Sequence, residues 1–280
     1  MATKEALKTT SGDSATLLAQ ENQDGSTSKG PQFRIFPGLV SGPLDKMTDN
    51  DEMRNSQTYL ADVAYSRVPG KELTSGCFRM MSGPALQYRY TYEEMKFIAE
   101  GVFHLTDGTG QTAVVRAGDL VYFPKGCNVT FKTPHYAAGV FTGQRKEGEV
   151  LGDEDSLGNP KFVVFPQIIF KNLDKMDDGD SQKNSNTYFG DMAFSEVAGK
   201  ELATGVFRML SGGPPLEYTY TYEEMKFIAE GVFHLTDGTG QKGVAKAGDL
   251  VYFPKGCQVQ FQTPHYAAGV FTGQRKNGEQ

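Results

Sequence analysis

The stretch YTYEEMKFIAEGVFHLTDGTGQ at Tyr90–Gln111 decides the fold, because it recurs without a single change at Tyr220–Gln241. Shorter segments recur around both copies in the same order: AGDLVYFPKGC begins at Ala117 and Ala247, and TPHYAAGVFTGQRK begins at Thr133 and Thr263. The repeating unit is roughly 115 residues long, which is the size of a domain and far longer than the unit of a solenoid. The pattern therefore indicates a tandem duplication of one domain.

The repeat divides the chain into four parts. Residues 33–146 form the first unit and residues 162–280 the second. Residues 1–32 are rich in Ser, Thr, Gly, Gln and Lys with almost no aromatic side chains, so we expect a disordered N-terminal tail. Residues 147–161, EGEVLGDEDSLGNPK, are acidic and contain glycines, which is typical of a linker.

Within each unit the residue pattern is that of β-strands. Short aromatic and β-branched runs are separated by Gly, Pro or Asp-Gly, and in the first unit they are QYRYTY, KFIAEGVFHLT, DLVYFP, NVTFKT and AAGVFTG. No run with helical periodicity and caps interrupts them, apart from one short turn around LDKMTDNDEM. Short strands at regular intervals favour a sandwich or barrel, so we predict an all-β chain of two tandem jelly-roll β-barrels.

Composition excludes several classes of partner. The formal net charge is −6 at pH 7, whereas binding to nucleic acid or to an anionic membrane requires a basic surface. No apolar run approaches the roughly 20 residues that span a bilayer. The N-terminus lacks the apolar core of a signal peptide, so we expect a cytoplasmic protein. The three cysteines match neither a disulfide framework nor a zinc motif.

The run EEMKFIAEGVFHLTDGTGQTAVVRAGDLVYFPKGC resembles the two signature motifs of the cupins. The matching residues are Glu94 and Gly101 for the first motif and Gly118, Pro124 and Gly126 for the second. In the second unit they are Glu224, Gly231, Gly248, Pro254 and Gly256. The phrase YFPKGCxVxFxTP is similar to the EutQ-like group of cupins. The resemblance implies a bicupin, in which duplication supplies the partner that cupins commonly find by dimerising. A homodimer of bicupins stays open.

Tyrosines stand where cupins carry their paired metal-binding histidines. They are Tyr88 and Tyr90 in the first unit and Tyr218 and Tyr220 in the second. The histidine that normally follows the Pro-x-Gly turn is replaced by Val129 and Val259. A neutral phenol with a pKa near 10 is a poor ligand for first-row divalent metals. We therefore predict no metal and no other cofactor, and leave open an atypical set of glutamate, tyrosinate and histidine ligands.

Side chains along a strand alternate between its two faces, which groups the candidate site residues. If Glu94 points into the barrel, as the resemblance implies, then Lys96, Tyr88 and Tyr90 point inward with it. Tyr92 shares this parity but is expected to lie in the turn between strands. The second unit repeats the set as Glu224, Lys226, Tyr218 and Tyr220.

The candidate residues suit acid–base chemistry on a small oxygenated metabolite. A carboxylate beside a lysine can act as a base, while a phenol donates a proton to a developing enolate oxygen. We therefore predict proton abstraction next to a carbonyl, followed by isomerisation or elimination. Arg79 and Arg208, in the matched FRM segments, are candidates for binding an anionic group of the substrate. His104 and His234 are further substrate-binding candidates.

Two other functions stay open. A ligand-binding or scaffold bicupin without turnover predicts a filled barrel, in which Glu94 and Lys96 form a salt bridge that closes a former metal site. A metal-dependent enzyme predicts the atypical ligand set. The tyrosines also suit core packing, and the arginines and histidines also suit exposed strand positions. An enzyme requires an open cavity with convergent polar groups, and the near identity of the units predicts two equivalent sites.

Overall fold

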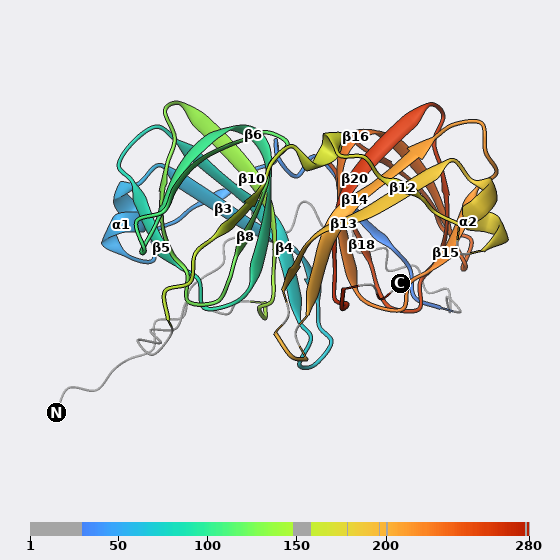
Figure 1. Ribbon diagram of the computed structural model, residues 1–280, viewed down its shortest axis with the longest axis horizontal. Helices are drawn as coiled ribbons and strands as arrows, with labels where there is room; N and C mark the ends of the chain where they lie inside the picture. Colours follow the sequence, from blue (N-terminus) through green and yellow to red (C-terminus); the bar gives the residue numbers. More distant parts are fainter. Residues whose placement is uncertain are drawn as a thin grey trace.

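Two barrels of β-strands stand side by side in the computed structural model (Figure 1). The structure describes residues 30–147, 158–177, 179–195, 197–199, 201–277 and 279. Its two sheets contain ten strands each, which confirms the predicted all-β bicupin. Most of the predicted tail and of the predicted linker lies outside the described residues. No helix in the described ranges has the length and apolar character needed to cross a bilayer.

The strands and α-helices follow the same order in both repeats, and the second repeat adds one 3-10 helix. The first repeat forms β1 (Arg34–Phe36), β2 (Asp45–Lys46), α1 (Asp51–Asn55), β3 (Thr58–Ser66), β4 (Leu73–Met81), β5 (Leu86–Arg89), β6 (Glu94–Asp107), β7 (Thr112–Arg116), β8 (Leu120–Phe123), β9 (Asn128–Lys132) and β10 (Tyr136–Gly143). The second repeat forms β11 (Val163–Phe165), the 3-10 helix η2 (Ile168–Phe170), β12 (Asp174–Lys175), α2 (Asp180–Asn184), β13 (Thr187–Ser195), β14 (Leu202–Leu210), β15 (Leu216–Thr219), β16 (Glu224–Asp237), β17 (Lys242–Lys246), β18 (Leu250–Phe253), β19 (Gln258–Gln262) and β20 (Tyr266–Gly273).

The long strand β6 positions the candidate site and changes face halfway along its length. Up to Ile98 the even-numbered side chains point into the barrel, whereas farther along odd-numbered residues such as Phe103 do. The register against β10 shifts between Ile98 and Glu100, which is a β-bulge. Gly101 follows with a φ of 70°, and a Cβ there would lie 2.0 Å from the carbonyl oxygen of Tyr136. Backbone geometry therefore requires the glycine of the first motif.

The two repeats exchange one short strand each. β1 pairs antiparallel with β18 of the second barrel, where Ile35 lies opposite Val251. β11 pairs in the same way with β8 of the first barrel, where Val164 lies opposite Val121. Each sheet therefore contains the strands of one predicted unit, except that its first short strand comes from the other unit. Because the exchange is reciprocal, neither barrel completes its sheet without the other half of the chain.

An arginine on β4 or β14 binds the segment that follows the exchanged strand of its own repeat. After β1, the guanidinium of Arg79 donates to the carbonyl oxygens of Val40 and of Gly42, the latter at 3.1 Å. After β11, Arg208 makes the matching contact with the carbonyl oxygen of Ile169. These two arginines, predicted to bind an anionic substrate group, thus bind backbone carbonyls at the seam between the barrels.

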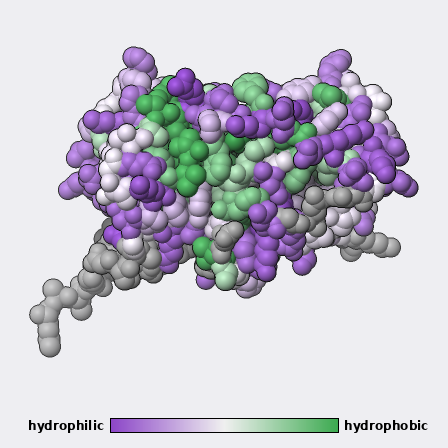
Figure 2. All heavy atoms as spheres, in the orientation of Figure 1, coloured by the Kyte–Doolittle hydropathy of each residue, from purple (hydrophilic) through white to green (hydrophobic). Residues whose placement is uncertain are grey.

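Apolar side chains from both barrels form a shared core between them. Phe97 on β6 and Phe227 on β16 lie with their ring centroids 5.9 Å apart, and Met95 and Met225 are 1% exposed in the same cluster. Apolar side chains also gather over the middle of the face shown in Figure 2, while its two ends are largely polar. Burial of the shared core around Phe97 and Phe227 stabilises the paired barrels relative to separated ones.

Phe33 provides a test of the exchange, because it precedes β1 in the first repeat but packs in the core of the second barrel at 2% exposure. We expect Phe33→Ala to lower the free energy of unfolding by about 3–5 kcal/mol, as for other fully buried phenylalanines. Urea unfolding measures this change, and hydrogen exchange should locate the lost protection in β16–β20. Arg34→Ala, at an exposed neighbouring position, should cost less than about 0.5 kcal/mol. Protection lost in the first barrel alone would contradict the exchange.

Candidate functional site

A carboxylate and an ammonium group lie together inside the first barrel. Glu94 and Lys96 point inward from β6, and Oε1 of Glu94 lies 2.8 Å from Nζ of Lys96. Their side chains are 4% and 5% exposed. Removing two charges from water carries a penalty of roughly several kcal/mol for each ion. The surrounding groups must therefore compensate both charges.

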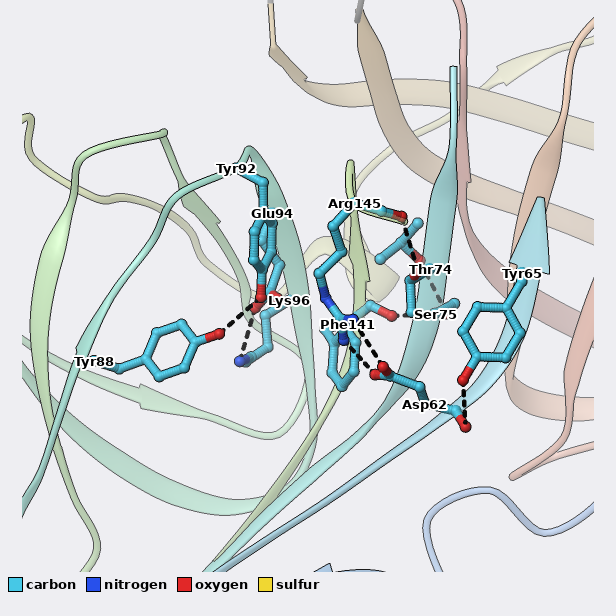
Figure 3. Close-up of polar contacts among 11 residues, drawn as sticks. Asp62, Tyr65, Thr74, Ser75, Tyr88, Tyr92, Glu94, Lys96, Phe141 and Arg145 are labelled. Atoms are coloured by element: carbon cyan, nitrogen blue, oxygen red, sulfur yellow. Dashed lines mark hydrogen bonds and ion pairs between the residues drawn. The ribbon is translucent and has the colours of Figure 1, made fainter. Parts of the chain in front are cut away.

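Tyrosine hydroxyls surround the carboxylate. Tyr90 donates to Oε1 of Glu94 at 3.1 Å, and Tyr92 donates to Oε2 at 3.3 Å. The hydroxyls of Tyr88 and Tyr92 share a hydrogen bond of 2.9 Å, which joins Tyr88 on β5 to the group. Figure 3 shows both of these tyrosines pointing toward Glu94 and Lys96. We call these five residues the first cluster, and it contains every residue that the sequence predicted for the interior of this barrel.

Aromatic rings enclose the ammonium group of the first cluster. Nζ of Lys96 lies 4.6 Å from the ring centroid of Phe78. Four more ring centroids lie between 5.4 and 5.8 Å away, those of Tyr90, Phe123, Phe131 and Phe141. Attraction between a cation and the faces of such rings replaces part of the lost hydration.

The second barrel repeats the arrangement with one difference. Nζ of Lys226 lies 3.1 Å from Oε1 of Glu224, and Tyr220 donates to the same oxygen at 3.3 Å. Tyr218 and Tyr222 share a hydrogen bond of 3.1 Å. Among the described residues, however, no hydrogen bond joins Tyr222 to Glu224, in contrast to Tyr92 and its glutamate. Within the described ranges, Oε2 of Glu224 therefore lacks the tyrosine donor that its counterpart in Glu94 has. We call Tyr218, Tyr220, Tyr222, Glu224 and Lys226 the second cluster.

A cavity of about 20 Å³ adjoins the second cluster. Its lining includes Tyr218, Tyr222 and Glu224, together with Met176 and Phe207. A cavity of this size holds about one ordered water molecule. The interior is thus close to the filled barrel that the scaffold hypothesis predicts, although the cavity lies against the very groups that the enzyme hypothesis requires.

Burial keeps the tyrosines of both clusters protonated. It raises the pKa of Tyr90 and Tyr220 well above the ordinary value of a phenol, and the neighbouring glutamates add to the rise. Burial likewise raises the pKa of Tyr88, Tyr92, Tyr218 and Tyr222. It lowers the pKa of Lys226, while Glu224 favours the charged form. At neutral pH the hydroxyls are therefore hydrogen-bond donors and not tyrosinate anions.

Family comparisons match parts of both repeats. The family described as ethanolamine utilisation protein EutQ matches residues 149–274, and the family described as EutQ-like cupin domain matches residues 75–136. Each repeat of this tandem bicupin therefore contains a match to an EutQ or EutQ-like cupin family. This confirms the resemblance that the two signature motifs carry.

Two curated relatives of the bicupin are named acetate kinase EutQ. The protein from Clostridioides difficile is 24% identical over 109 residues, which cover 39% of this chain and 66% of that protein. The protein from Salmonella typhimurium is 33% identical over 70 residues, which cover 25% of this chain and 29% of that protein. The bicupin thus matches less than two thirds of the length of either relative.

Solved structures share the fold of the bicupin at low sequence identity. Protein Ylba from E. coli superposes with a TM-score of 0.60 and 12% identity, covering 96% of this chain and 100% of that chain. A mutant of oxalate decarboxylase OxdC from Bacillus subtilis superposes with a TM-score of 0.52 and 13% identity, covering 79% and 73%. Likeness at this level of identity establishes the architecture.

The donor set of the bicupin does not fit a divalent metal at the cupin motif position. The carboxylate of Glu94 is paired with Lys96, and the phenols around it stay protonated. Val129, at the place of the third histidine, is 0% exposed in the apolar core. A metal would have to displace the ammonium and deprotonate phenols of raised pKa. In the described part of the chain, no three His, Cys, Asp or Glu side chains gather as metal ligands.

The structure adds residues that sequence reasoning left out. Tyr92, expected in the turn, donates to Glu94. The guanidinium of Arg145 lies 5.5 Å from the ring centroid of Tyr92 and binds both carboxylate oxygens of Asp62, one of them at 2.7 Å. The second barrel has the same arrangement in Tyr222, Arg275 and Asp191. The sequence offered one sign of this arrangement: an aspartate and an arginine stand at matched positions of both repeats.

His104 and His234 lie away from the clusters. Both are exposed on the outer face of their barrel, because the β-bulge reverses the direction of the side chains that follow it. His104 stands opposite Val114 on β7 and Lys132 on β9. The structure therefore does not bring the predicted substrate-binding histidines to the carboxylates, and it places the predicted arginines at the seam.

Removing one partner of the buried ion pair tests its role in the barrel. We expect Lys96→Met to lower the free energy of unfolding by about 3–5 kcal/mol, because it leaves an uncompensated buried carboxylate. Adding Glu94→Leu to this variant should restore most of the loss, as measured by urea unfolding. Arg54→Ala, which breaks a pair whose side chains are 60% and 89% exposed, should cost less than about 1 kcal/mol. If Lys96→Met and Arg54→Ala lowered the free energy of unfolding equally, the role assigned to the buried ion pair would be contradicted.

Alkaline titration tests the raised pKa values of the tyrosines. Above a pH of about 10 an unfolded tyrosine loses its proton, whereas a buried cluster tyrosine keeps it, so stability falls as pH rises. Lys226 acts in the opposite direction below a pH of about 10.4, but it is one group against six phenols. We expect the tyrosinate absorbance of the cluster to appear together with the loss of the β-sheet circular dichroism signal. Cluster ionisation that clearly precedes unfolding would contradict the burial argument.

Proposed function

We propose that the chain is a metal-independent bicupin that binds a short oxygenated organic molecule in its barrel and transfers a proton on it. The observation that carries this proposal is the position of the cavity in the second barrel. Its lining contains the carboxylate of Glu224, the ammonium of Lys226 and the tyrosine hydroxyls of the second cluster. An apolar pocket with a few convergent polar groups is the common form of a small-molecule site.

The second cluster offers the two partners of an enolisation. Glu224 would take a proton from a carbon next to a carbonyl group, and the electron pair of the broken C–H bond would move to the carbonyl oxygen. A protonated phenol, Tyr222 or Tyr218, would donate to this oxygen as its negative charge develops. Return of the proton to another carbon completes an isomerisation, and loss of a leaving group completes an elimination.

The names of the curated relatives support a short carboxylate as the class of ligand. Both are named acetate kinase, and acetate is among the smallest organic acids. A cavity of about 20 Å³ requires such a small molecule, and it requires Tyr218 to rotate away from Tyr222 as the molecule enters. We do not propose phosphoryl transfer. In the DGTGQ turn the backbone N–H groups of Thr109 and Gln111, which could otherwise bind a phosphate, donate to the carboxylate of Asp107.

A second candidate function is a scaffold or binding protein without turnover. Two observations favour it: the ion-paired side chains are 3–5% exposed, and the cavity holds about one water molecule. In this case the clusters would serve as polar cores that hold each barrel in one arrangement. Binding of the probe without proton exchange would distinguish the scaffold from the enzyme.

Proton exchange into pyruvate tests the proposal. In deuterium oxide, the wild-type chain should replace the methyl protons of pyruvate with deuterium, and nuclear magnetic resonance follows the reaction. The double variant Glu94→Gln/Glu224→Gln should exchange at least about 100-fold more slowly, because it has lost its general base. A matched control is Glu100→Gln/Glu230→Gln, whose glutamates accept hydrogen bonds from Tyr136 and Tyr266 at the seam.

The control variant is expected to exchange like the wild type. Full exchange by the Glu94→Gln/Glu224→Gln variant would show that the site lies elsewhere. A wild-type chain that does not exchange the methyl protons of pyruvate overturns the acid–base proposal.

A further inference from the structure

The two barrels differ at one end although their inner clusters have the same sequence. A short helix stands beside β5 or β15 at each end of the molecule, α1 in the first barrel and α2 in the second (Figure 1). α1 reads DEMRN and α2 reads DSQKN, so Met53 corresponds to Gln182. We use the word mouth for the end of each barrel that this helix covers.

In the first barrel the side chain of Met53 fills the mouth. It is 1% exposed and belongs to the same apolar cluster as Leu86 on β5 and Tyr90. Met47, which precedes α1, is 9% exposed in this cluster. Methionine is flexible and polarisable, so it fits irregular space in an apolar core. The first cluster is therefore covered from the side of α1.

In the second barrel no residue of α2 is buried. The side-chain oxygen of Gln182 is shielded from solvent and lacks a hydrogen-bond partner in the described part of the chain. This oxygen is thus shielded from water without a compensating hydrogen bond, which carries a free-energy penalty that the thioether of Met53 avoids. Met176, the counterpart of Met47, is half-buried and lines the cavity beside Tyr218. The second cluster therefore has a cavity beside it, and the helix that covers this end of its barrel buries no residue.

The attachment of the two helices differs in the same sense. The side chain of Asn50 caps α1 by accepting a hydrogen bond from the backbone N–H of Met53 at 2.8 Å. At the start of α2 stands Gly179, which has no side chain for this contact. The loop before β15 reads SGGPP, one residue longer than the SGPA loop before β5. α2 thus lacks both the cap and the apolar anchor of α1.

We infer that the second barrel is the one that admits a small molecule, and that the residue at position 53 or 182 decides whether a barrel is open or plugged. This inference rests on the proposed function for the class of molecule admitted. It replaces the sequence-based expectation of two equivalent sites with one open site and one plugged copy. Both inner clusters carry the same carboxylate, ammonium and phenols, so the difference lies in the residues that surround them.

Oxidation of methionines by hydrogen peroxide tests the inference without any ligand. Met176 should oxidise at least about fivefold faster than Met47 in the full-length chain, because sulfoxide formation follows access to the sulfur. Peptide mass spectrometry separates the two sites. Gln182→Met should slow the oxidation of Met176 toward the rate of Met47, and Met53→Gln should speed the oxidation of Met47. Met53→Ala opens the mouth without adding a polar group, so the test holds even where Met53→Gln disturbs the barrel.

The pyruvate assay adds a functional arm. Gln182→Met should reduce the exchange at least about tenfold, and Met53→Ala should raise it to at most about twofold, since two open barrels act independently. The inference would be overturned, whatever the pyruvate result, if Met47 and Met176 oxidised at equal rates and neither Gln182→Met nor Met53→Gln changed those rates. Unequal oxidation without any pyruvate exchange would uphold the open second barrel and reject the proposed acid–base function.

Discussion

The buried pair of Glu94 and Lys96 is the constraint on which the barrel interior depends. Both charges leave water, and this is tolerated because two phenols and several aromatic rings surround them. A positive charge still lies beside the glutamate of the cupin motif, and the ammonium of Lys96 supplies it. The neighbouring phenols keep their protons beside this ammonium, because burial raises their pKa. The cluster is thus a set of donors around one acceptor.

The reciprocal strand exchange makes the two barrels one structural unit. β1 completes the sheet of the second barrel and β11 that of the first, while Arg79 and Arg208 hold the segments that follow. The shared core around Phe97 and Phe227 then excludes water from the seam. A duplication of the domain gives both halves of this exchange in a single chain, so the pairing needs no second molecule.

Identity inside the barrels coexists with a difference at their mouths. The segment YTYEEMK supplies four of the five residues of each cluster, and its tyrosines, glutamate and lysine occupy matching positions. The residue that covers the cluster comes from a separate helix, where Met53 and Gln182 differ in polarity. A long identical repeat therefore does not guarantee two equivalent sites, because access to a site depends on residues outside the repeat's most similar part.

The amino-acid sequence by itself determined the duplication, the all-β class, the cupin turns and the inward set of Tyr88, Tyr90, Glu94 and Lys96, since alternation along a strand is a local property. The tertiary structure decided what depends on distant segments. The β-bulge before Gly101 turned His104 outward, and the strand exchange took Arg79 to the seam. Tyr92 joined the cluster because the turn returns its hydroxyl to the carboxylate. Each of these outcomes depends on backbone register or chain crossing, which no local pattern of residues encodes.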